Sequence, residues 1–239
     1  MTPASGLPPL IVFDLDDTIV DHAGAEAPAQ RETYDAFPGL FDGVPFEAWR
    51  LAYRAANTRL WGAYGRGEIG RPDLHARRFG EPMGELGIDP SRVDEVAEFY
   101  LSRYPAHWRL NEGAEEVLEA ASRLGTVGIL SNGFKELVRA KVARFRLDRW
   151  AKVVVVSEEV GFMKPDRRIF DAALEAAGGG ERRKVYVGDS FEDDVLGAKG
   201  AGWLPILYRP AGDPPPVPVL WIRRLVDAGP LLGHTREER

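Results

Sequence analysis

The sequence predicts an α/β protein, with a Rossmann-like parallel sheet that carries helices on both faces and an inserted all-helical domain. From about residue 113, short apolar runs without alternation take turns with helical apolar patterns, which is typical of parallel sheets. An aromatic-rich stretch without such runs separates this region from a first strand at residues 10–13. We therefore assign residues 1–20 and 106–239 to the core domain and residues 21–105 to the helical domain.

The individual elements follow from spacing and from Gly and Pro breaks. In the helical domain, Phe46, Trp49 and Tyr53 recur at helical spacing, and breaks near 38–39, 65–72 and 87–90 divide the segment into several helices. The core is expected to continue with helices at 114–124, 134–145, 169–177 and 195–202, and with strands at 126–130, 152–156, 185–187 and 204–208. The tail from Pro210, rich in proline up to about Pro218, is given no function.

The amino-acid composition argues against several classes of binding partner. The net charge of −6 argues against binding to a nucleic acid polymer, which needs a concentrated basic face. The chain contains no cysteine, so disulfides and thiolate metal sites are excluded. No apolar run approaches the roughly 18 residues of a membrane span, and the first ten residues do not resemble a signal peptide. We expect a cytoplasmic protein without a membrane partner.

Four polar clusters follow predicted strands or begin predicted helices of the core. They are Asp14-Leu15-Asp16-Asp17-Thr18, Ser131-Asn132-Gly133, Lys164-Pro165, and Gly188-Asp189 with Asp193-Asp194. In open α/β sheets, ligands bind outside the carboxyl ends of the strands. The fold should therefore bring these distant clusters together in one site.

The residue types in these clusters suit phosphoryl transfer. Grouped carboxylates such as Asp14 and Asp189 repel one another unless a cation intervenes, and Mg²⁺ prefers oxygen ligands shared with phosphate. A carboxylate, here Asp14, can attack phosphorus, and Asp16 can supply and remove the proton. The expected phosphate-binding residues are Thr18, Ser131, Asn132 and Lys164.

The four motifs together resemble those of the haloacid dehalogenase superfamily of phosphohydrolases. The resemblance covers the chain except for its proline-rich tail. It implies that Asp14 is the nucleophile and Asp16 the general acid/base, and that Asp14, the backbone carbonyl of Asp16 and Asp189 hold Mg²⁺. It also implies a further acid that acts through water or orients Lys164. Two adjacent residues are candidates for this further acid. Asp194 fits because the residues Val-Leu-Gly-Ala follow it, whereas Asp193 would fit a motif whose spacing is one residue shorter. Asp194 is preferred.

Residues 21–105 resemble the helical cap of the first cap class, a lid that closes over the phosphate site and excludes water. The strings 57–61 and 67–69, with Tyr64 and Arg78-Phe79, are similar to the branch that contains pyrimidine nucleotidases and N-acylneuraminate-9-phosphatase. Asn57, Trp61 and Arg78 are therefore candidate substrate contacts. For Trp61 and Phe79, the alternative is packing in the cap core.

The sequence predicts a phosphomonoester hydrolase that acts on a small metabolite, and other activities are alternatives to it. A 2-haloacid dehalogenase would need no acid at Asp16, because a halide leaves without a proton. A slowly turning over phospho-aspartate switch would need neither Asp16 nor the large insertion. A mutase, which returns the phosphoryl group to its substrate, stays open. The sequence also leaves open the oligomeric state and the choice among nucleotide, sugar phosphate and phosphoglycolate.

Overall fold

The computed structural model describes residues 6–215 and 217–233, and these form two compact units. One unit comprises the chain up to Asp21 and from Leu110 onward, and the other comprises His22–Arg109. The boundaries expected from the sequence, after residues 20 and 105, lie close to these positions. We call the two units the core and the cap and describe each by itself.

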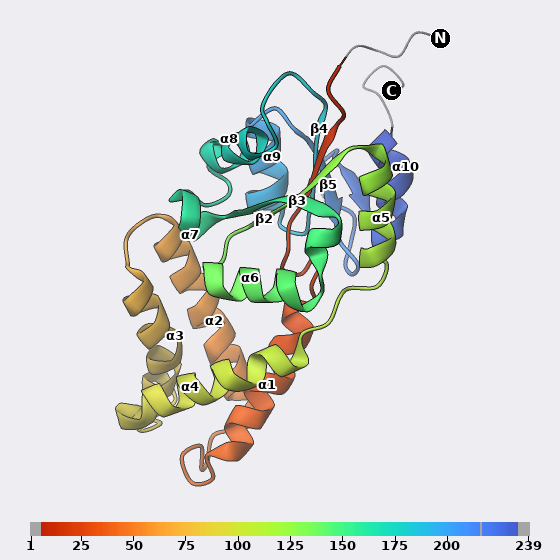
Figure 1. Ribbon diagram of the computed structural model, residues 1–239. Helices are drawn as coiled ribbons and strands as arrows, with labels where there is room; N and C mark the ends of the chain where they lie inside the picture. Colours follow the sequence, from red (N-terminus) through yellow and green to blue (C-terminus); the bar gives the residue numbers. More distant parts are fainter. Residues whose placement is uncertain (1–5, 216, 234–239) are drawn as a thin grey trace. The chain divides into compact units, whose positions relative to one another are not determined.

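The core is built on one six-stranded sheet whose strands are all parallel, in the order β3-β2-β1-β4-β5-β6 (Figure 1). The strands are β1 (Leu10–Phe13), β2 (Thr126–Ser131), β3 (Ala151–Val156), β4 (Lys184–Gly188), β5 (Leu204–Tyr208) and β6 (Leu220–Ile222). The central strand β1 is completely buried, as its apolar run without alternation predicts. The predicted α/β fold class is confirmed.

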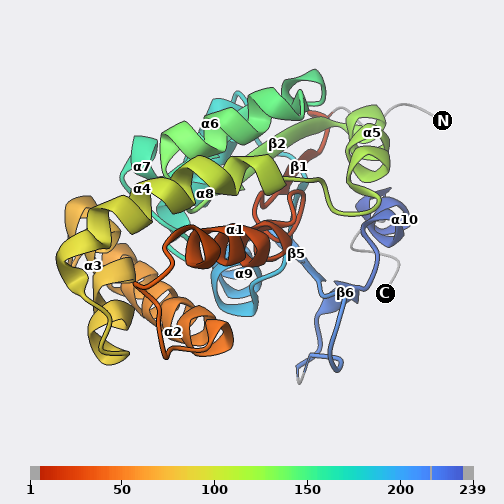
Figure 2. The same ribbon diagram turned by 90° about the horizontal axis from the view of Figure 1, so that it is seen from below.

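Helices cover both faces of the sheet. Ile11 and Phe13 point to the face covered by α5, α6 and α10, whereas Leu10 and Val12 point to the face covered by α8 and α9. Figure 2 shows α5 and α10 next to each other at one end of the sheet. The helices of the core are α5 (Ala114–Leu124), α6 (Lys135–Arg144), α7 (Ser157–Val160), α8 (Arg167–Ala176), α9 (Gly197–Gly200) and α10 (Ala228–Gly233), with helical turns η3 (Leu147–Arg149), η4 (Phe191–Leu196) and η5 (Leu225–Asp227).

The tail contributes more to the fold than the sequence suggested. After the proline-rich segment, β6 adds a parallel strand to β5, with Ile206 opposite Leu220. Leu225, Ala228 and Leu232 then join the apolar core on the α5 side. A three-residue strand after a run of prolines carries too little pattern to be recognised from one sequence.

The cap contains α1 (His22–Ala36), α2 (Phe46–Gly65), α3 (Arg71–Glu85) and α4 (Val93–Arg103), with helical turns η1 (Pro90–Arg92) and η2 (Tyr104–His107). The predicted breaks coincide with the connections between these helices. Trp49, Tyr53, Phe79 and Tyr100 form an aromatic core, with the Tyr53 and Phe79 ring centroids 5.0 Å apart. Phe79 is completely buried, so it belongs to this packing rather than to a surface that meets substrate.

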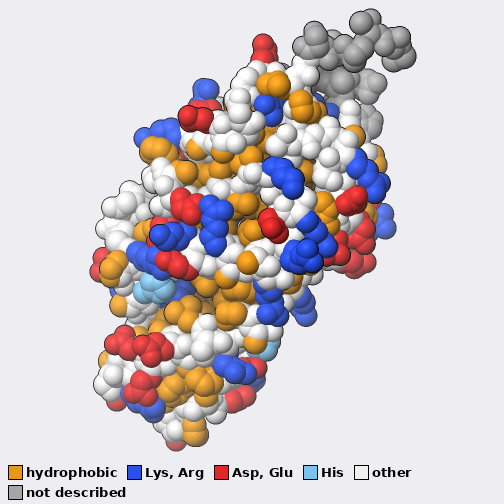
Figure 3. Space-filling model, viewed as in Figure 1, with side chains coloured by type: hydrophobic (Ala, Val, Ile, Leu, Met, Phe, Trp, Pro, Cys, Tyr) orange, Lys and Arg blue, Asp and Glu red, His pale blue; other side chains and the backbone are white. Residues whose placement is uncertain are grey.

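The surface charges and the lengths of the helices are relevant to the predictions that the protein binds neither a nucleic acid polymer nor a membrane. On the face seen in Figure 3, basic side chains lie among acidic ones. The described residues also form surface ion pairs, such as Arg59–Glu81 and Arg139–Glu159. Within residues 6–215 and 217–233, no helix has the length and apolar character needed to cross a membrane.

Candidate active site

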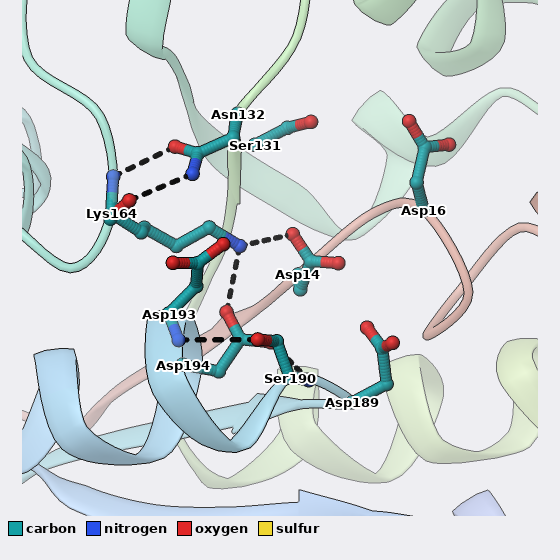
Figure 4. Close-up of a pocket in the computed structure, with 9 residues that line it drawn as sticks. All are labelled: Asp14, Asp16, Ser131, Asn132, Lys164, Asp189, Ser190, Asp193 and Asp194. Atoms are coloured by element: carbon teal, nitrogen blue, oxygen red, sulfur yellow. Dashed lines mark hydrogen bonds and ion pairs between the residues drawn. The ribbon is translucent and has the colours of Figure 1, made fainter. Parts of the chain in front are cut away.

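The carboxyl ends of three neighbouring strands bring the predicted motifs together. Asp14 follows β1, Ser131 ends β2 and Asp189 follows β4, and these strands are adjacent in the sheet. Figure 4 shows the pocket at this edge. Its lining side chains are Asp14, Asp16, Ser131, Asn132, Lys164, Asp189, Ser190, Asp193 and Asp194.

A buried lysine joins two of the acids. The Lys164 Nζ atom donates to Asp14 Oδ1 at 2.5 Å and to Asp194 Oδ1 at 2.7 Å, and it lies 3.0 Å from the Tyr186 hydroxyl. Lys164, Asp14 and Asp194 are 5%, 6% and 1% exposed. The Tyr186 hydroxyl, which belongs to none of the four motifs, donates in turn to the Leu130 carbonyl. This network fixes the amine beside the predicted nucleophile.

The turn after β4 sets the position of Asp194. Residues Phe191–Leu196 form a wide π-helical turn, and the Ser190 amide donates to Asp194 Oδ2 at 2.9 Å. Gly188 is needed here because a Cβ atom at this position would collide with the Asp194 carboxylate. The carboxylate of Asp194, rather than that of Asp193, therefore reaches Lys164; the Asp193 side chain also lines the pocket.

The second motif supports Lys164 from its backbone side. Asn132 Oδ1 accepts from the Lys164 amide at 2.8 Å, and Asn132 Nδ2 donates to the Lys164 carbonyl at 3.0 Å. The Asn132 amide, expected to bind phosphate, thus holds the loop that carries the lysine. Ser131 is almost completely buried and lines the pocket.

Thr18 has a different contact from the one the sequence suggested. It is completely buried and does not line the pocket, and its hydroxyl donates to Asp189 Oδ1 at 3.2 Å. Asn111 Nδ2 donates to the Thr18 carbonyl, so hydrogen bonds hold both the side chain and the backbone of Thr18. In this arrangement the Thr18 hydroxyl orients the Asp189 carboxylate, and its predicted contact with phosphate stays a prediction.

Asp16 is paired with a lysine that sequence reasoning missed. Lys141 Nζ donates to Asp16 Oδ1 at 2.5 Å, and Lys141 is only 2% exposed. In Figure 4 the Asp16 carboxylate lies apart from the cluster formed by Asp14 and Asp194. The signal was present in the sequence, since Lys141 follows Val138 by three residues on the predicted apolar face of its helix.

Burial and mutual repulsion control the charges of the acids. Burial raises the pKa of Asp14 well above its usual range; Asp194 and Asp189 raise it further, whereas Lys164 opposes the shift. Burial also raises the pKa of Asp189 to about 7, with further contributions from Asp194 and Asp17. Burial alone would lower the pKa of Lys164, but Asp14 and Asp194 together raise it well above the usual value. Lys164 is therefore a stable cation.

The donor set fits a divalent metal. Asp14, Asp189 and Asp194 each offer a carboxylate oxygen, and these oxygens lie within 4.8 Å of one another. One lysine cannot neutralise three neighbouring carboxylates, two of which are buried. All the donors are hard oxygens, which are the ligand atoms that Mg²⁺ prefers. Softer transition metals favour nitrogen and sulfur ligands instead.

This cluster predicts how stability depends on pH. A folded-state pKa of about 7 for Asp189, against 3.8 for an exposed carboxyl, means that the folded protein binds more protons than the unfolded chain in this range. Without metal, the free energy of unfolding should fall as the pH rises from about 4 to about 7. Each pKa unit corresponds to about 1.4 kcal/mol, so Asp189 accounts for at most about 4 kcal/mol.

The check is thermal unfolding at about pH 5 and about pH 8, in EDTA and in saturating MgCl₂. The Tm in EDTA should be lower at the higher pH, and MgCl₂ should restore it there because the metal binds the ionised carboxylates. Asp189→Asn should reduce both effects, whereas the exposed Asp171→Asn should keep them. A Tm in EDTA that rises over this interval would contradict the charge assignment.

The three cap candidates have different environments. Trp61 is partly buried, and its ring packs against Tyr64 with a centroid distance of 5.7 Å. Arg78 is 6% exposed, and Asn57 is partly buried with its Oδ1 atom inaccessible to solvent. Trp61 thus has a packing contact, which is the alternative to a substrate contact given above, whereas Arg78 and Asn57 place polar atoms inside the cap.

Comparison with known proteins defines the class. Residues 8–202 match the model of the haloacid dehalogenase-like hydrolase family, so the chain belongs to this family. This confirms the family expected from the four motifs. The match includes every core residue assigned above to the site.

Individual relatives of the chain within this family are named as a nucleotidase and a phosphatase. The chain is 34% identical over 210 residues to the pyrimidine 5'-nucleotidase YjjG of Escherichia coli, covering 83% of this chain and 87% of the relative. It is 33% identical over 221 residues to a phosphoserine phosphatase of Thermus thermophilus, covering 81% and 85%. The crystal structure of the HAD-hydrolase YfnB from Bacillus subtilis bound to magnesium is similar with a TM-score of 0.79 and 25% identity, covering 95% of this chain and 100% of that chain. These likenesses confirm the prediction of an HAD-type phosphatase.

Proposed function

We propose that this chain is a magnesium-dependent phosphomonoester hydrolase that works through a phosphorylated Asp14. The observation that carries the proposal is the buried contact of Lys164 with both Asp14 and Asp194 at the end of β1. A cation held beside a carboxylate can balance the charge of an incoming phosphoryl group while that carboxylate attacks phosphorus. The family match and the named phosphatases among the relatives support this chemistry.

In the first step, an oxygen of Asp14 attacks phosphorus as the bond from phosphorus to the ester oxygen breaks. Asp16 gives a proton to the departing alkoxide, so the products are an alcohol and an aspartyl phosphate. In the second step, water attacks the same phosphorus and loses a proton to Asp16. The bond to Asp14 breaks, inorganic phosphate leaves, and both carboxyl groups return to their starting states.

Other residues bind and orient. Lys164 and the Ser131 hydroxyl face the pocket and suit the outer oxygens of the phosphoryl group, while Asp194 and Asn132 hold Lys164 in place. Asp14, the Asp16 carbonyl and Asp189 would hold Mg²⁺, with Asp194 close to them. When bound, the metal supplies positive charge that offsets repulsion between the carboxylates and the phosphate.

The pairing of Asp16 with Lys141 predicts a kinetic phenotype. Lys141→Met should slow the release of phosphate from an alkyl phosphate by about 10- to 100-fold, because Asp16 would no longer be fixed for proton transfer. Lys141→Arg, which keeps the charge, should lose less. The measurement is steady-state release of inorganic phosphate, and a double variant with Asp16→Asn should be no slower than Asp16→Asn alone. Additive losses would refute the pairing as a functional one.

The substrate is proposed to be a small phosphorylated metabolite, with Asn57, Trp61 and Arg78 as the cap residues expected to contact its remainder. The relatives include named phosphatases of pyrimidine nucleotides, phosphoserine, glyceraldehyde 3-phosphate and phosphoglycolate. A cytoplasmic location and the lack of a nucleic acid partner stay predictions.

A panel of phosphomonoesters, assayed with MgCl₂ and with EDTA, tests the proposed function. p-Nitrophenyl phosphate should be hydrolysed with many turnovers in MgCl₂ and scarcely at all in EDTA. Stable labelling of the protein without turnover would instead indicate a phospho-aspartate switch. Chloride release from 2-chloropropionate without phosphatase activity would indicate a dehalogenase.

A further inference from the structure

The amine of Lys164 has one acceptor for each of its three hydrogens. A protonated lysine amine carries three N–H donors and no acceptor. These donors reach Asp14 Oδ1 at 2.5 Å, Asp194 Oδ1 at 2.7 Å and the Tyr186 hydroxyl at 3.0 Å. In Figure 4 the amine lies between the two carboxylates. Of the three acceptors, the hydroxyl is the one without a charge, and the mechanism above gives it no role.

A second hydrogen bond sets the direction of the Tyr186 hydroxyl. Its O–H group donates to the Leu130 carbonyl at 3.3 Å, so the lone pairs of the oxygen are left to accept from Lys164. Leu130 directly precedes Ser131, which lines the pocket. The Tyr186 hydroxyl therefore connects the Lys164 amine to the end of β2.

Packing in the core holds the Tyr186 ring in place. The residue lies in β4 and is completely buried. Its ring centroid lies 5.2 Å from that of Phe170 and 6.5 Å from that of Trp203, and both pairs have edge-to-face geometry. The hydroxyl is therefore carried by a strand and by packed rings, which position a polar group more precisely than a loop does.

The hydroxyl stays protonated and uncharged beside the lysine. Burial raises the pKa of Tyr186 well above its usual range, the Asp194 charge raises it further, and Lys164 opposes the shift. A third carboxylate at this position would surround the amine with three anions and cancel the charge that it presents to phosphate. A neutral acceptor orients the amine and preserves that charge.

Phosphoryl transfer to Asp14 removes one of the three acceptors. When an Asp14 oxygen bonds to phosphorus, the carboxylate becomes an acyl phosphate and loses the negative charge that attracts Lys164. The N–H group that pointed to Asp14 can then meet an oxygen of the phosphoryl group. Asp194 and Tyr186 are the two contacts that remain. One contact alone would let the amine rotate about it, whereas two fix its direction.

We propose that the Tyr186 hydroxyl is a positioning group that, together with Asp194, keeps the Lys164 amine directed at the phosphoryl group during the reaction. This inference rests on the proposed phosphatase function and adds to it a residue outside the four motifs. Tyr186 does not line the pocket, so it acts through Lys164. Loss of the hydroxyl should weaken binding of the transition state more than binding of the substrate, because charge develops on the phosphoryl oxygens in the transition state.

The test compares wild type with Tyr186→Phe, which removes the hydroxyl and keeps the packed ring. The control is Tyr34→Phe, because the Tyr34 hydroxyl also donates to a backbone carbonyl, that of Val44 at 2.6 Å, and Tyr34 does not line the pocket. The kcat and KM values are measured with p-nitrophenyl phosphate and MgCl₂. Inhibition constants are measured for inorganic phosphate and for vanadate, which adopts the five-coordinate shape of the transition state. The Tm of each protein is recorded.

Tyr186→Phe should lower kcat by about 10-fold and change KM by less than about 2-fold. The inhibition constant of vanadate should rise by the factor by which kcat/KM falls, whereas that of inorganic phosphate should hardly change. Tyr34→Phe should match wild type in all these constants. Because an inhibition constant does not depend on how much of the enzyme is folded, it distinguishes a misdirected amine from a loss of folded protein.

A double variant tests whether the hydroxyl acts through the amine. Lys164→Met removes the amine, so adding Tyr186→Phe to it should slow the residual turnover no further. Losses that multiply in the double variant would mean that the hydroxyl acts independently of Lys164, and they would overturn the inference.

Two further results would also overturn it. One is a Tyr186→Phe protein with the wild-type kcat and the wild-type inhibition constant for vanadate. The other is a fall in Tm and activity without a change in that inhibition constant, which would show a purely structural role. Failure of wild type to hydrolyse any phosphomonoester would instead refute the proposed function itself.

Discussion

Asp14→Asn should abolish phosphatase turnover and leave the protein folded. A carboxamide is a poor nucleophile, and loss of a nucleophile that acts together with its partners costs about 10⁴-fold or more. The replacement has nearly the same shape, and it removes one charge from a crowded set of buried acids. The Tm without metal should therefore stay the same or increase.

The experiment pairs activity with folding. Phosphate release from p-nitrophenyl phosphate is compared for wild type, Asp14→Asn and Asp171→Asn, with Tm measured for each. Asp171 is an exposed aspartate on α8 that pairs with Arg167, so it controls for the loss of a carboxylate as such. An Asp14→Asn protein that retains wild-type turnover would remove Asp14 from the mechanism.

Lys164→Met should reduce both activity and stability. Its amine contacts Asp14 and Asp194, which are both almost completely buried. Removing one partner of a buried ion pair costs about 3–5 kcal/mol, because the remaining charges lose their compensation. Turnover should fall by at least about 100-fold, since the same amine is proposed to meet the phosphoryl group.

The loss of stability should depend on pH. With the amine absent, the folded protein must protonate its acids, so Lys164→Met should be destabilised more at about pH 8 than at about pH 5. Thermal unfolding in EDTA measures this difference. Lys152→Met is the matched control, because Lys152 is exposed and its amine contacts only the backbone carbonyls of Asp148 and Arg149 among the described residues. Equal destabilisation at both pH values would contradict the proposed charge balance.

The sequence predicts the position of a site residue well where a polar residue directly follows a buried strand. The sequence predicts that Asp14, Ser131 and Asp189 lie together because each follows a predicted buried strand, and the parallel sheet aligns those strand ends. Their proposed catalytic roles come from the resemblance and stay predictions until the variants are measured.

Contacts made by helix faces and turns were harder to predict. The position of Lys141 on the apolar face of its helix predicts that its side chain is buried, but its pairing with Asp16 depends on how α6 packs against the sheet. The contact of Thr18 with Asp189 likewise depends on the path of the chain after β1. Arg78 is singled out by the resemblance alone, and the burial of its Nε and Nη2 atoms, which have no hydrogen-bond partner among the described residues, depends on how the cap packs around it.

The most direct measurement is acid quenching of Asp16→Asn after brief exposure to p-nitrophenyl phosphate and MgCl₂, followed by peptide mass analysis. With p-nitrophenolate as a good leaving group, the first step needs no proton from Asp16, whereas the second step lacks its base. The mechanism predicts a phosphoryl group on Asp14, sensitive to hydroxylamine as an acyl phosphate is. A phosphoryl group on Ser131 or Asp189, or p-nitrophenolate release without any labelled peptide, would contradict it.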